Sequence, residues 1–382
     1  MRFCGILLST ICYGIGCIYL YKNAKTEFDK ETALTATVAI SVFPFGFFFG
    51  SIMTESLFLA IASAFLYYVR QHKWSMVAIL GFLACLTKVQ GLLLTFAVLV
   101  ELFYSESGVA LLRGKKWRDF LHKVLLPGCQ AAVMLFGFVV YLLINYQVEG
   151  DPFRFLYYQS NHWYNGFAPI WTTLHYIIQN AITDWYTSTG MCLWVPELVL
   201  FFVYIAGFVY GFRRKMRPMY LAYLIAFCLL TYSSSWLISA GRYTLSALPL
   251  FLLEGDWLQR HEKRKFPILL FSSMLMMLYF VVDTTDEDFK KEIPSMPGQY
   301  QLSLKQLEKA VGEAVDAGLR SLMLFGIPKH KDAIASEAYA PNGIVQRAIR
   351  MLKAKWPSLQ VVTDVCLCEY TSHGHCGILK EG

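Results

Sequence analysis

Charge is scarce in this sequence of 382 residues. Only 16% of its residues are Asp, Glu, Lys or Arg, whereas a soluble domain contains about 25%. The net charge of +7 is modest, and Arg and Lys do not interleave with aromatic residues in the pattern of a nucleic-acid-binding face. Hydrophobic residues make up 56% and aromatic residues 16%, a composition typical of proteins with many positions at a membrane interface.

The sequence also lacks the cysteine spacing of a secreted disulfide framework. Seven of the ten cysteines stand singly in apolar segments, where buried thiols behave as small hydrophobic groups. The other three, Cys366, Cys368 and Cys376, are clustered near the C-terminus. A small-residue cleavage site does not follow the first apolar stretch, Phe3 to Tyr21, so we interpret it as a retained helix rather than a signal peptide.

Long apolar runs fill the first three quarters of the chain. They lie at about 3–21, 33–50, 52–69, 75–87, 89–103, 123–146, 191–212, 218–238, 243–257 and 266–283. A helix needs roughly 20 residues to cross the hydrocarbon layer. The two runs around Lys88 are shorter, and they predict either two short tilted helices or one re-entrant hairpin. The other runs predict membrane spans.

Basic residues between these runs predict the orientation of the chain. The clusters are Lys22/Lys25, Arg70/Lys73, Lys115/Lys116/Arg118, Arg213/Arg214/Lys215/Arg217 and Arg260/Lys263/Arg264/Lys265. The positive-inside rule places all five on the cytoplasmic side, and one alternating topology satisfies them. The outer side then holds the segments 49–56, 87–91, 147–190 and 233–244. Taking 266–283 as the last span places the C-terminal tail on the outer or lumenal side.

Three ionisable residues within or beside the apolar runs are candidates for a functional site. They are Glu55, Lys88 and Arg242, all in segments predicted to lie outside. Ionisable side chains at membrane depth are energetically costly, and those that persist are usually functional. The alternative is that each one reaches the interface or forms a structural ion pair.

The character of the sequence changes near Asp283. The stretch DTTDEDFKKEIPSMPGQ is polar and interrupted by Pro and Gly. Beyond it, periodicity predicts helices at 302–318 and 342–357 and strands at 319–326 and 359–368. Strand, helix and strand form a βαβ unit of a parallel sheet or barrel. We therefore predict a mostly α, polytopic transmembrane bundle at 1–283, a junction at 284–293, and a partial α/β segment, an incomplete TIM barrel, at 294–382.

Four stretches in the apolar part resemble a known enzyme family. They are FPFGFFFGSIMTESLFLAIASAFLYYVR (43–70), LACLTKVQGLLL (83–94), EGDPFRFLYYQSNHW (149–163) and SAGRYTLSALPLF (239–251). In this order they resemble GT-C glycosyltransferases, in particular PIG-V-like mannosyltransferases. The resemblance implies a membrane enzyme that uses a polyprenyl-phosphate sugar donor on the outer or lumenal face. It also implies that Glu55, Gln159, Arg242 and Tyr243 line the donor or acceptor site. Lys88 stands where the family more often has Arg.

The tail resembles a second, unrelated family. The stretches are EIPSMPGQYQLSL (292–304), LMLFGIPKHKD (322–332), SEAYAPNGIVQRAIRMLK (336–353) and TDVCLCEYTSHGHCGIL (363–379). They resemble porphobilinogen synthase, also called 5-aminolevulinate dehydratase, a heme-pathway lyase. The resemblance implies that Cys366, Cys368 and Cys376 bind a catalytic zinc and that Asp364 belongs to the active site. His373 and His375 would be supporting rather than ligating. Thiolates are soft ligands that select zinc.

The two resemblances together predict a fusion of unrelated pieces. The acidic outer loop expected in the transferase and the two Schiff-base lysines expected in the dehydratase are not in this sequence, so we expect neither activity from the chain as it stands. The alternatives are an active membrane mannosyltransferase and a porphobilinogen synthase with a membrane anchor. The expected partners are the lipid bilayer and a polyprenyl-phosphate donor. A homo-oligomer is expected only of a complete barrel, and nucleic acid is not an expected partner.

Overall fold

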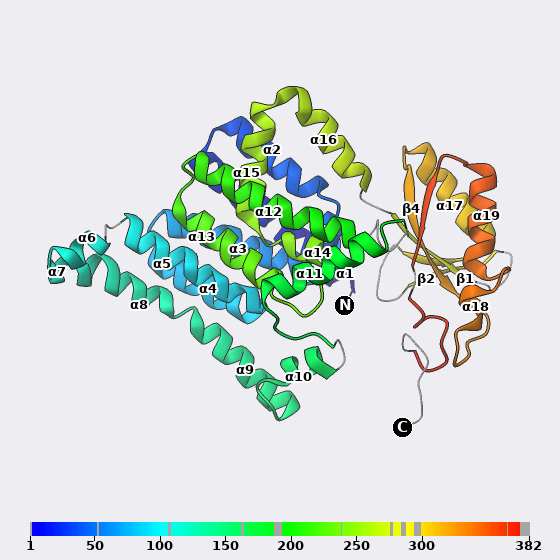
Figure 1. Ribbon diagram of the computed structural model, residues 1–382, viewed down its shortest axis with the longest axis horizontal. Helices are drawn as coiled ribbons and strands as arrows, with labels where there is room; N and C mark the ends of the chain where they lie inside the picture. The colour runs from blue at the N-terminus through cyan, green and yellow to red at the C-terminus, as the bar shows by residue number, and fades with distance from the viewer. Residues whose placement is uncertain are drawn as a thin grey trace. The chain divides into compact units, whose positions relative to one another are not determined.

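The computed structural model describes most of the chain in two compact units. The described residues are 2–51, 53–105, 108–161, 164–186, 193–237, 239–275, 278–283, 288–293, 299–364 and 366–374. The N-terminal unit is Gly5–Leu269, and the C-terminal unit consists mainly of Leu270–Gly382. Figure 1 shows the chain coloured from the N-terminus to the C-terminus.

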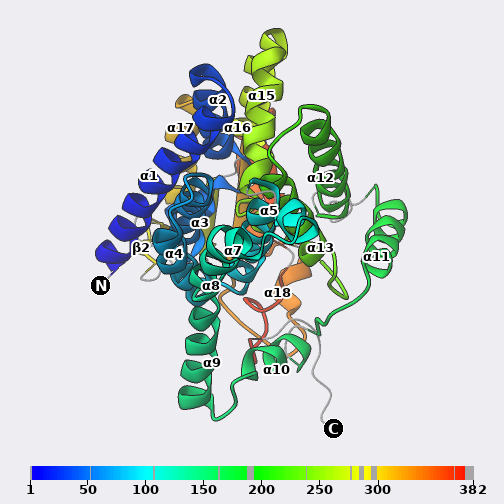
Figure 2. The ribbon, with the colours of Figure 1, turned by 90° about the vertical axis from the view of Figure 1, so that its left-hand side faces the viewer.

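The described part of the N-terminal unit is built from helices. They are α1 (Arg2–Glu27), α2 (Lys30–Val42), α3 (Glu55–Arg70), α4 (Trp74–Thr87), α5 (Leu94–Ser105), α6 (Gly108–Arg113), α7 (Trp117–Phe120), α8 (Leu126–Ala132), α9 (Leu135–Glu149), α10 (Arg154–Asn161), α11 (Ile170–Thr183), α12 (Val195–Arg213), α13 (Pro218–Thr231), α14 (Ala240–Thr244) and α15 (Leu248–Arg260). Two short 3₁₀ segments, Gly46–Gly50 and Val89–Leu93, and a π-helical turn, Leu121–Leu125, join them. Figure 2 shows this unit from the side, and α4 packs there against α3, α8 and α9.

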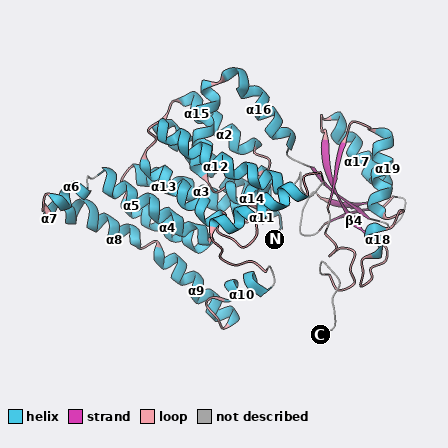
Figure 3. Cartoon of the chain, in the orientation of Figure 1, coloured by secondary structure: helices cyan, strands magenta, loops and turns pink. Residues whose placement is uncertain are grey.

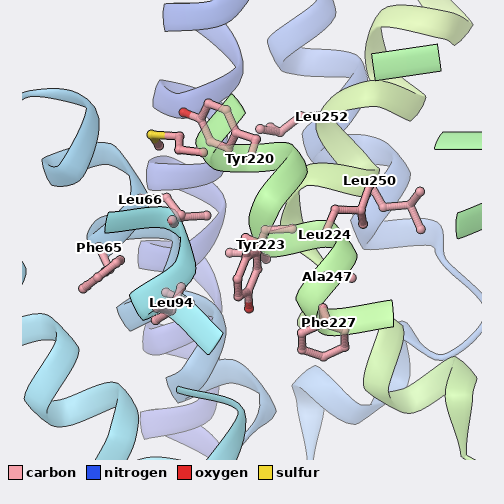
Figure 4. Close-up of a cluster of buried hydrophobic side chains, with 14 of the residues drawn as sticks. Phe65, Leu66, Leu94, Tyr220, Tyr223, Leu224, Phe227, Ala247, Leu250 and Leu252 are labelled. Atoms are coloured by element: carbon pink, nitrogen blue, oxygen red, sulfur yellow. The ribbon is translucent and has the colours of Figure 1, made fainter. Parts of the chain in front are cut away.

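The core of this unit forms around α13. Tyr220, Tyr223 and Phe227 of this helix are almost fully buried, and they pack in one cluster with Phe65 of α3 and Leu94 of α5 (Figure 4). Large apolar side chains also cover the outside of the unit. Folding in water normally removes apolar surface from solvent, and this unit leaves much of it exposed.

Three helical stretches are long and apolar enough to cross a membrane among the described residues. They are Gly5–Glu27, Trp117–Glu149 and Val195–Arg213. At most 22% of the apolar window in each of them is buried inside the unit. Most of the remaining apolar runs of the sequence form shorter helices. The runs around Lys88 form α4 and α5, two short helices joined by the 3₁₀ segment Val89–Leu93, an arrangement that fits both predicted alternatives.

The prediction of a membrane span at 266–283 is wrong. Helix α16 (Glu262–Leu275) covers its first part, and residues Leu278–Asp283 form strand β1 of a sheet. A helix of 14 residues is about 21 Å long, which is too short to cross about 30 Å of hydrocarbon. A short apolar run before a polar boundary has the same composition in a buried strand as in a helix.

The C-terminal unit is a five-stranded sheet covered by helices. Its strands are β1 (Leu278–Asp283), β2 (Lys290–Glu292), β3 (Tyr300–Leu302), β4 (Ser321–Ile327) and β5 (Gln360–Thr363), in the order β2-β3-β1-β4-β5. β1 is parallel to β3 and β4, β4 is parallel to β5, and β2 is an antiparallel edge. Helices α17 (Leu304–Asp316) and α19 (Ile344–Lys355) lie along one face, beside the strands drawn in magenta in Figure 3.

Local signals in the sequence explain these elements. The side chain of Ser303 accepts a hydrogen bond from the backbone N–H of Gln306 and caps the start of α17. Gly318 follows the helix with φ +102, a backbone conformation that favours glycine. Leu307 of α17 and Ala348 and Leu352 of α19 are buried against Leu324 of β4. The predicted helices at 302–318 and 342–357 are thereby confirmed. The strand predicted at 359–368 is shorter, and ends at Thr363.

Candidate functional site

Glu55, Lys88 and Arg242, which come from three distant parts of the sequence, meet in the N-terminal unit. The Nε atom of Arg242 donates to Oε1 of Glu55 at 2.7 Å, and Nζ of Lys88 donates to the same oxygen at 3.1 Å. The Glu55 side chain is 1% exposed, that of Lys88 15% and that of Arg242 34%. We call these three residues the Glu55 cluster. Its formal charge is +1, and Arg242 is its most accessible member.

Breaks in helical structure place the three side chains. Glu55 is the first residue of α3, and Lys88 has an extended backbone (φ −150, ψ 144) between α4 and the 3₁₀ segment Val89–Leu93. Arg242 lies on the short helix α14, directly after Gly241. A Cβ atom at Gly241 would lie 2.1 Å from the ring of Phe45, so only glycine allows α14 to approach the FPFG segment this closely. Aromatic rings line the cluster, with the Arg242 guanidinium 4.8 Å from the Phe48 ring centroid.

One carboxylate oxygen of Glu55 accepts no hydrogen bond from the described residues. Oε2 is buried and has no hydrogen-bond partner there. Buried polar atoms are nearly always hydrogen-bonded in proteins. The cluster therefore offers one buried acceptor oxygen beside two cationic groups.

The sequence analysis did not single out Glu197, which supports the cluster from α12. Its side chain is buried, and its two carboxylate oxygens accept hydrogen bonds from the backbone N–H of Ala240 at 3.0 and 3.1 Å. Ala240 is the first residue of α14, so Glu197 holds the helix that carries Arg242. The signal for it was present in the sequence, since Glu197 is an ionisable residue inside an apolar run.

The other two predicted substrate-binding residues lie outside these contacts. Tyr243 follows Arg242 on α14 and is 36% exposed. Gln159 is exposed on α10, and its carbonyl oxygen accepts a hydrogen bond from the N–H of Asn165. The described contacts do not join Gln159 to the Glu55 cluster directly. They connect the loop after it to residues 233–236, through the bridge between Phe167 and Ser234.

Carboxylates that are buried or nearly so form ion pairs with the basic loops at the other end of the helices. Glu27 pairs with Arg70, Glu101 with His72 and Arg217, and Asp256 with Arg214 and Arg260. Four of the five predicted cytoplasmic clusters lie in or directly beside these segments. Glu55 and Arg70 stand at opposite ends of α3, whose 16 residues span about 24 Å. The Glu55 cluster and the basic loops are thus separated along the helix axis.

In the C-terminal unit, the cysteine-rich stretch starts where strand β5 ends. Asp364 directly follows β5, and its N–H donates to the carbonyl of Leu324 on β4 at 3.0 Å. Cys366 and Cys368 come next and are half-buried. Side chains that follow parallel strands meet at the carboxyl edge of a sheet, where α/β proteins place their ligand sites. The structure thus places Asp364, Cys366 and Cys368 at a suitable edge.

The loop after β4 holds this stretch in place. Asp332 forms a parallel bridge with Thr371, and its carbonyl accepts the N–H of Ser372 at 2.9 Å. His373 contacts the carbonyl of Ala333 at 3.4 Å. The carboxylate of Asp332 accepts bonds from the hydroxyl and N–H of Ser336 and the N–H of Ile334, and these bonds hold its pKa below the usual range.

Tyr370 fixes the same stretch to the sheet. It is 7% exposed, and burial, followed by the charge of Glu369, raises its pKa to about 12. Its hydroxyl lies 2.4 Å from where a Cβ atom of Gly326 would be. Gly326 on β4 therefore provides the space in which Tyr370 docks.

The third predicted zinc ligand lies outside the described residues. Cys376 and His375 both belong to that part of the chain. Within the described part, His, Cys, Asp and Glu side chains do not form a group of three that could hold a metal ion. Two thiols at one edge fit the donor chemistry of a zinc site, and Cys376 is needed to complete the predicted set.

Comparison with known proteins shows what this region is similar to. A family model described as delta-aminolevulinic acid dehydratase matches residues 262–382. The C-terminal region is porphobilinogen synthase-like. The delta-aminolevulinic acid dehydratase of Ruminiclostridium josui is 52% identical over 101 residues, which cover 26% of this chain and 48% of the relative. That of Archaeoglobus fulgidus is 52% identical over 93 residues, which cover 24% of this chain and 29% of the relative.

A solved structure of the same enzyme is also similar. It is the crystal structure of delta-aminolevulinic acid dehydratase (porphobilinogen synthase) from Toxoplasma gondii ME49 in complex with the reaction product porphobilinogen, with 40% sequence identity and a TM-score of 0.26. The match covers 28% of this chain and 30% of that one. The chain spans about half the length or less of the relatives that it matches.

Proposed function

We propose that the C-terminal unit is a zinc-binding segment of the porphobilinogen synthase type. The observation that carries the proposal is the position of Asp364, Cys366 and Cys368 directly after β5, at the carboxyl edge of a parallel sheet. Cys376 would be the third ligand. A zinc ion held by three thiolates keeps a fourth position for water or substrate and acts there as a Lewis acid.

The test is a zinc measurement on the purified full-length chain. We expect about one zinc per chain, and Cys368→Ser should remove most of it because thiolates supply the affinity. Cys129→Ser is the matched control, since Cys129 is exposed in the N-terminal unit. Zinc retained in both Cys368→Ser and Cys376→Ser, or lost equally in Cys129→Ser, overturns the proposal.

A second function is proposed for the N-terminal unit. We infer that it is a multi-pass membrane domain of the GT-C type that binds the phosphate of a polyprenyl-phosphate sugar donor. The Glu55 cluster supports this, because it joins two cationic groups and keeps a net positive charge. An arginine presents a planar set of donors that matches phosphate, while a lysine acts as a point charge. The apolar exterior of α1, α9 and α12 supports the membrane setting.

Binding of polyprenyl phosphate in lipid vesicles tests this second proposal. Arg242→Met should raise the dissociation constant at least tenfold, since it removes the most accessible cation of the cluster. Arg154→Met is the control, because Arg154 is also in a segment predicted to lie outside and stacks on Tyr157 rather than on the cluster. Equal affinity of the two variants contradicts the proposal. Inorganic phosphate as a competitor separates recognition of the headgroup from recognition of the lipid.

We also propose that the two units belong to one polypeptide. Because residues 278–283 form a strand, the predicted membrane span at 266–283 no longer carries the chain across the membrane. We therefore place the C-terminal unit on the same side of the membrane as the basic cluster at 260–265. A membrane-impermeant thiol reagent should then modify Cys368 only after the membrane is permeabilised. Intact mass spectrometry of the purified protein tests the fusion, because a chain containing both units has a mass of 43.7 kDa.

A further inference from the structure

Helix α11 has three differently composed faces. Thr173, Ile177 and Ala181 are buried at i, i+4 and i+8. Trp171, Ile178 and Ile182 share a second face at i, i+7 and i+11, and their exposed fractions are 71%, 39% and 69%. The exposed polar residues Thr172, Gln179 and Thr183 form a third face. At about 100° per residue, the apolar and polar exposed faces adjoin each other.

Contacts of Tyr176 and Thr173 fix α11 to the end of a candidate membrane span. α11 packs on α12, and the ring of Tyr176 meets that of Trp194, just before α12, edge-on at 5.4 Å. The hydroxyl of Thr173 donates to the carbonyl of Ser234. α11 therefore lies at the N-terminal end of α12, the same end that holds Glu197. An element at the end of a span lies at the level of the boundary between lipid and water.

The composition of α11 also fits that boundary. The helix has no Asp, Glu, Lys or Arg. It is 14 residues long, or about 21 Å, which is too short to cross the hydrocarbon layer. Trp171 stands near its start, and Trp185 and Tyr186 follow its end with exposed fractions of 63% and 76%. Trp and Tyr concentrate at membrane interfaces, where the ring contacts lipid and the polar atom contacts water.

We propose that α11 lies in the interfacial layer of the bilayer, with Trp171, Ile178 and Ile182 against lipid and Thr172, Gln179 and Thr183 toward water. The occupant of the apolar face is lipid, because α11 packs on the candidate span α12, which itself exposes the apolar side chains of Val199 and Phe202. This inference rests on the membrane placement proposed above. The Glu55 cluster does not explain the presence of the long loop at 147–190, and the inference gives this loop a role.

The anchor has a consequence for the segment that leads into α14. Residues 164–168 pair with 233–236 through the bonds from Ser235 N to the carbonyl of Gly166 and from Ala168 N to the carbonyl of Ser233. Trp236 also donates its ring N–H to the carbonyl of Tyr164 at 3.1 Å. Because both segments are tied to α11, its position at the interface fixes the approach to Ala240 and Arg242.

Photoreactive lipids test the inference on the unmodified full-length protein in vesicles. One probe carries a diazirine next to the glycerol, and the other carries it near the end of the acyl chain. We expect the shallow probe to label Trp171, Ile178 and Ile182 at least fivefold more than the deep probe does. Phe202, near the middle of α12, should be labelled mainly by the deep probe.

The outcomes separate the two proposals. Labelling of Phe202 without labelling of α11 overturns the interfacial helix and leaves the membrane domain standing. Absence of labelling at both sites overturns both. A matched pair of variants adds a second measurement: Ile182→Asp should reduce shallow labelling of Trp171 at least fivefold, whereas Thr183→Asp should leave it unchanged. Equal effects of the two variants also contradict the proposal.

Discussion

The two units differ in where they place their ion pairs. In the N-terminal unit the side chains of Glu55, Glu101 and Asp256 are 1%, 0% and 4% exposed, and each is paired with cationic groups. In the C-terminal unit the pair Lys355–Glu308 has exposed fractions of 55% and 37%. A buried charge is costly unless it is paired and hydrogen-bonded, whereas a surface pair contributes little. Ion pairs are therefore essential to the first unit and incidental to the second.

Apolar side chains show the reverse arrangement. Leu8 of α1, Phe136 of α9 and Phe212 of α12 are 58%, 62% and 70% exposed. In the C-terminal unit, Leu307 of α17 and Leu324 of β4 are 0% exposed. The first unit turns apolar surface outward and carboxylates inward, and the second does the opposite. The two units therefore differ in which side chains they expose to their surroundings.

The largest effect should come from removing a partner of a buried carboxylate. Arg217 holds both oxygens of Glu101 at 2.6–3.0 Å. Arg217→Met should destabilise the N-terminal unit by about 3–5 kcal/mol, because it leaves a buried charge poorly compensated. Thermal unfolding in detergent measures this loss. Arg213→Met, which changes an exposed arginine on the same segment, is the control, and an equal loss in both variants would contradict the comparison.

A core deletion should be the most damaging simple change in the C-terminal unit. Leu324→Ala should cost about 2–5 kcal/mol, since it removes buried methyl groups between the sheet and its helices. Limited proteolysis of the C-terminal unit as a function of temperature measures the loss. Ile334→Ala is its counterpart at a side chain that is 52% exposed. If Ile334→Ala lost as much stability as Leu324→Ala, the assignment of Leu324 to the core would be contradicted.

An acidic substitution at an exposed apolar side chain should have a larger effect in the N-terminal unit than in the C-terminal unit. Phe202→Asp places a carboxylate near the middle of α12 and should cost about 2.5–3.5 kcal/mol of membrane insertion. Ile334→Asp, at a similarly exposed position of the C-terminal unit, should change stability by less than about 0.5 kcal/mol. The carbonate-resistant fraction in microsomes measures insertion. Unchanged insertion of Phe202→Asp would show that α12 does not face lipid.

A substitution in the turn after β4 should have a smaller effect on local stability, and this effect should depend on pH. The hydroxyl and N–H of Ser336 lower the pKa of Asp332. A carboxyl group whose pKa is lower in the folded state stabilises that state above its usual pKa, and this contribution is lost as the pH falls through the folded value. Asp332→Asn should therefore weaken protection of residues 332–336 in hydrogen exchange at pH 7, and the difference should shrink in acid. If the difference in protection between the two proteins grew in acid, the lowered pKa of Asp332 would be contradicted.

The smallest effect should come from a surface ion pair. Lys355→Ala breaks the 2.6 Å contact with Glu308, and we expect a cost of at most about 1 kcal/mol, reduced further by salt. Thermal unfolding at low and at high salt measures it. A cost similar to that of Arg217→Met would mean that the two units do not differ in their use of charge.

Sequence periodicity predicted the helices of the C-terminal unit because their ends carry local signals. Ser303 and Gly318 mark the ends of α17, and the apolar residues between them repeat at helical spacing. The identity of strand β1 depends on pairing with β3 and β4, which the local sequence does not reveal. Without these neighbours, LYFVVD has the composition of the end of a membrane span.

The candidate site was also predicted only in part. Glu55, Lys88 and Arg242 stood out because charge is costly among apolar residues, and the structure brings them together. The same cost applies to Glu101, Glu197 and Asp256, which the sequence analysis passed over. Their roles depend on partners such as Arg217 and Ala240, and the fold, not the local sequence, determines which partners they meet.

The space beside Gly326 links the cysteine-rich stretch to the rest of the C-terminal unit. The hydroxyl of Tyr370 and a methyl group of Val345 of α19 both lie 2.4 Å from the position that a Cβ atom of Gly326 would take. Any side chain at position 326 would therefore displace Tyr370 and α19 together. The position of the stretch that carries Cys366 and Cys368 thus depends on a single missing methyl group in β4.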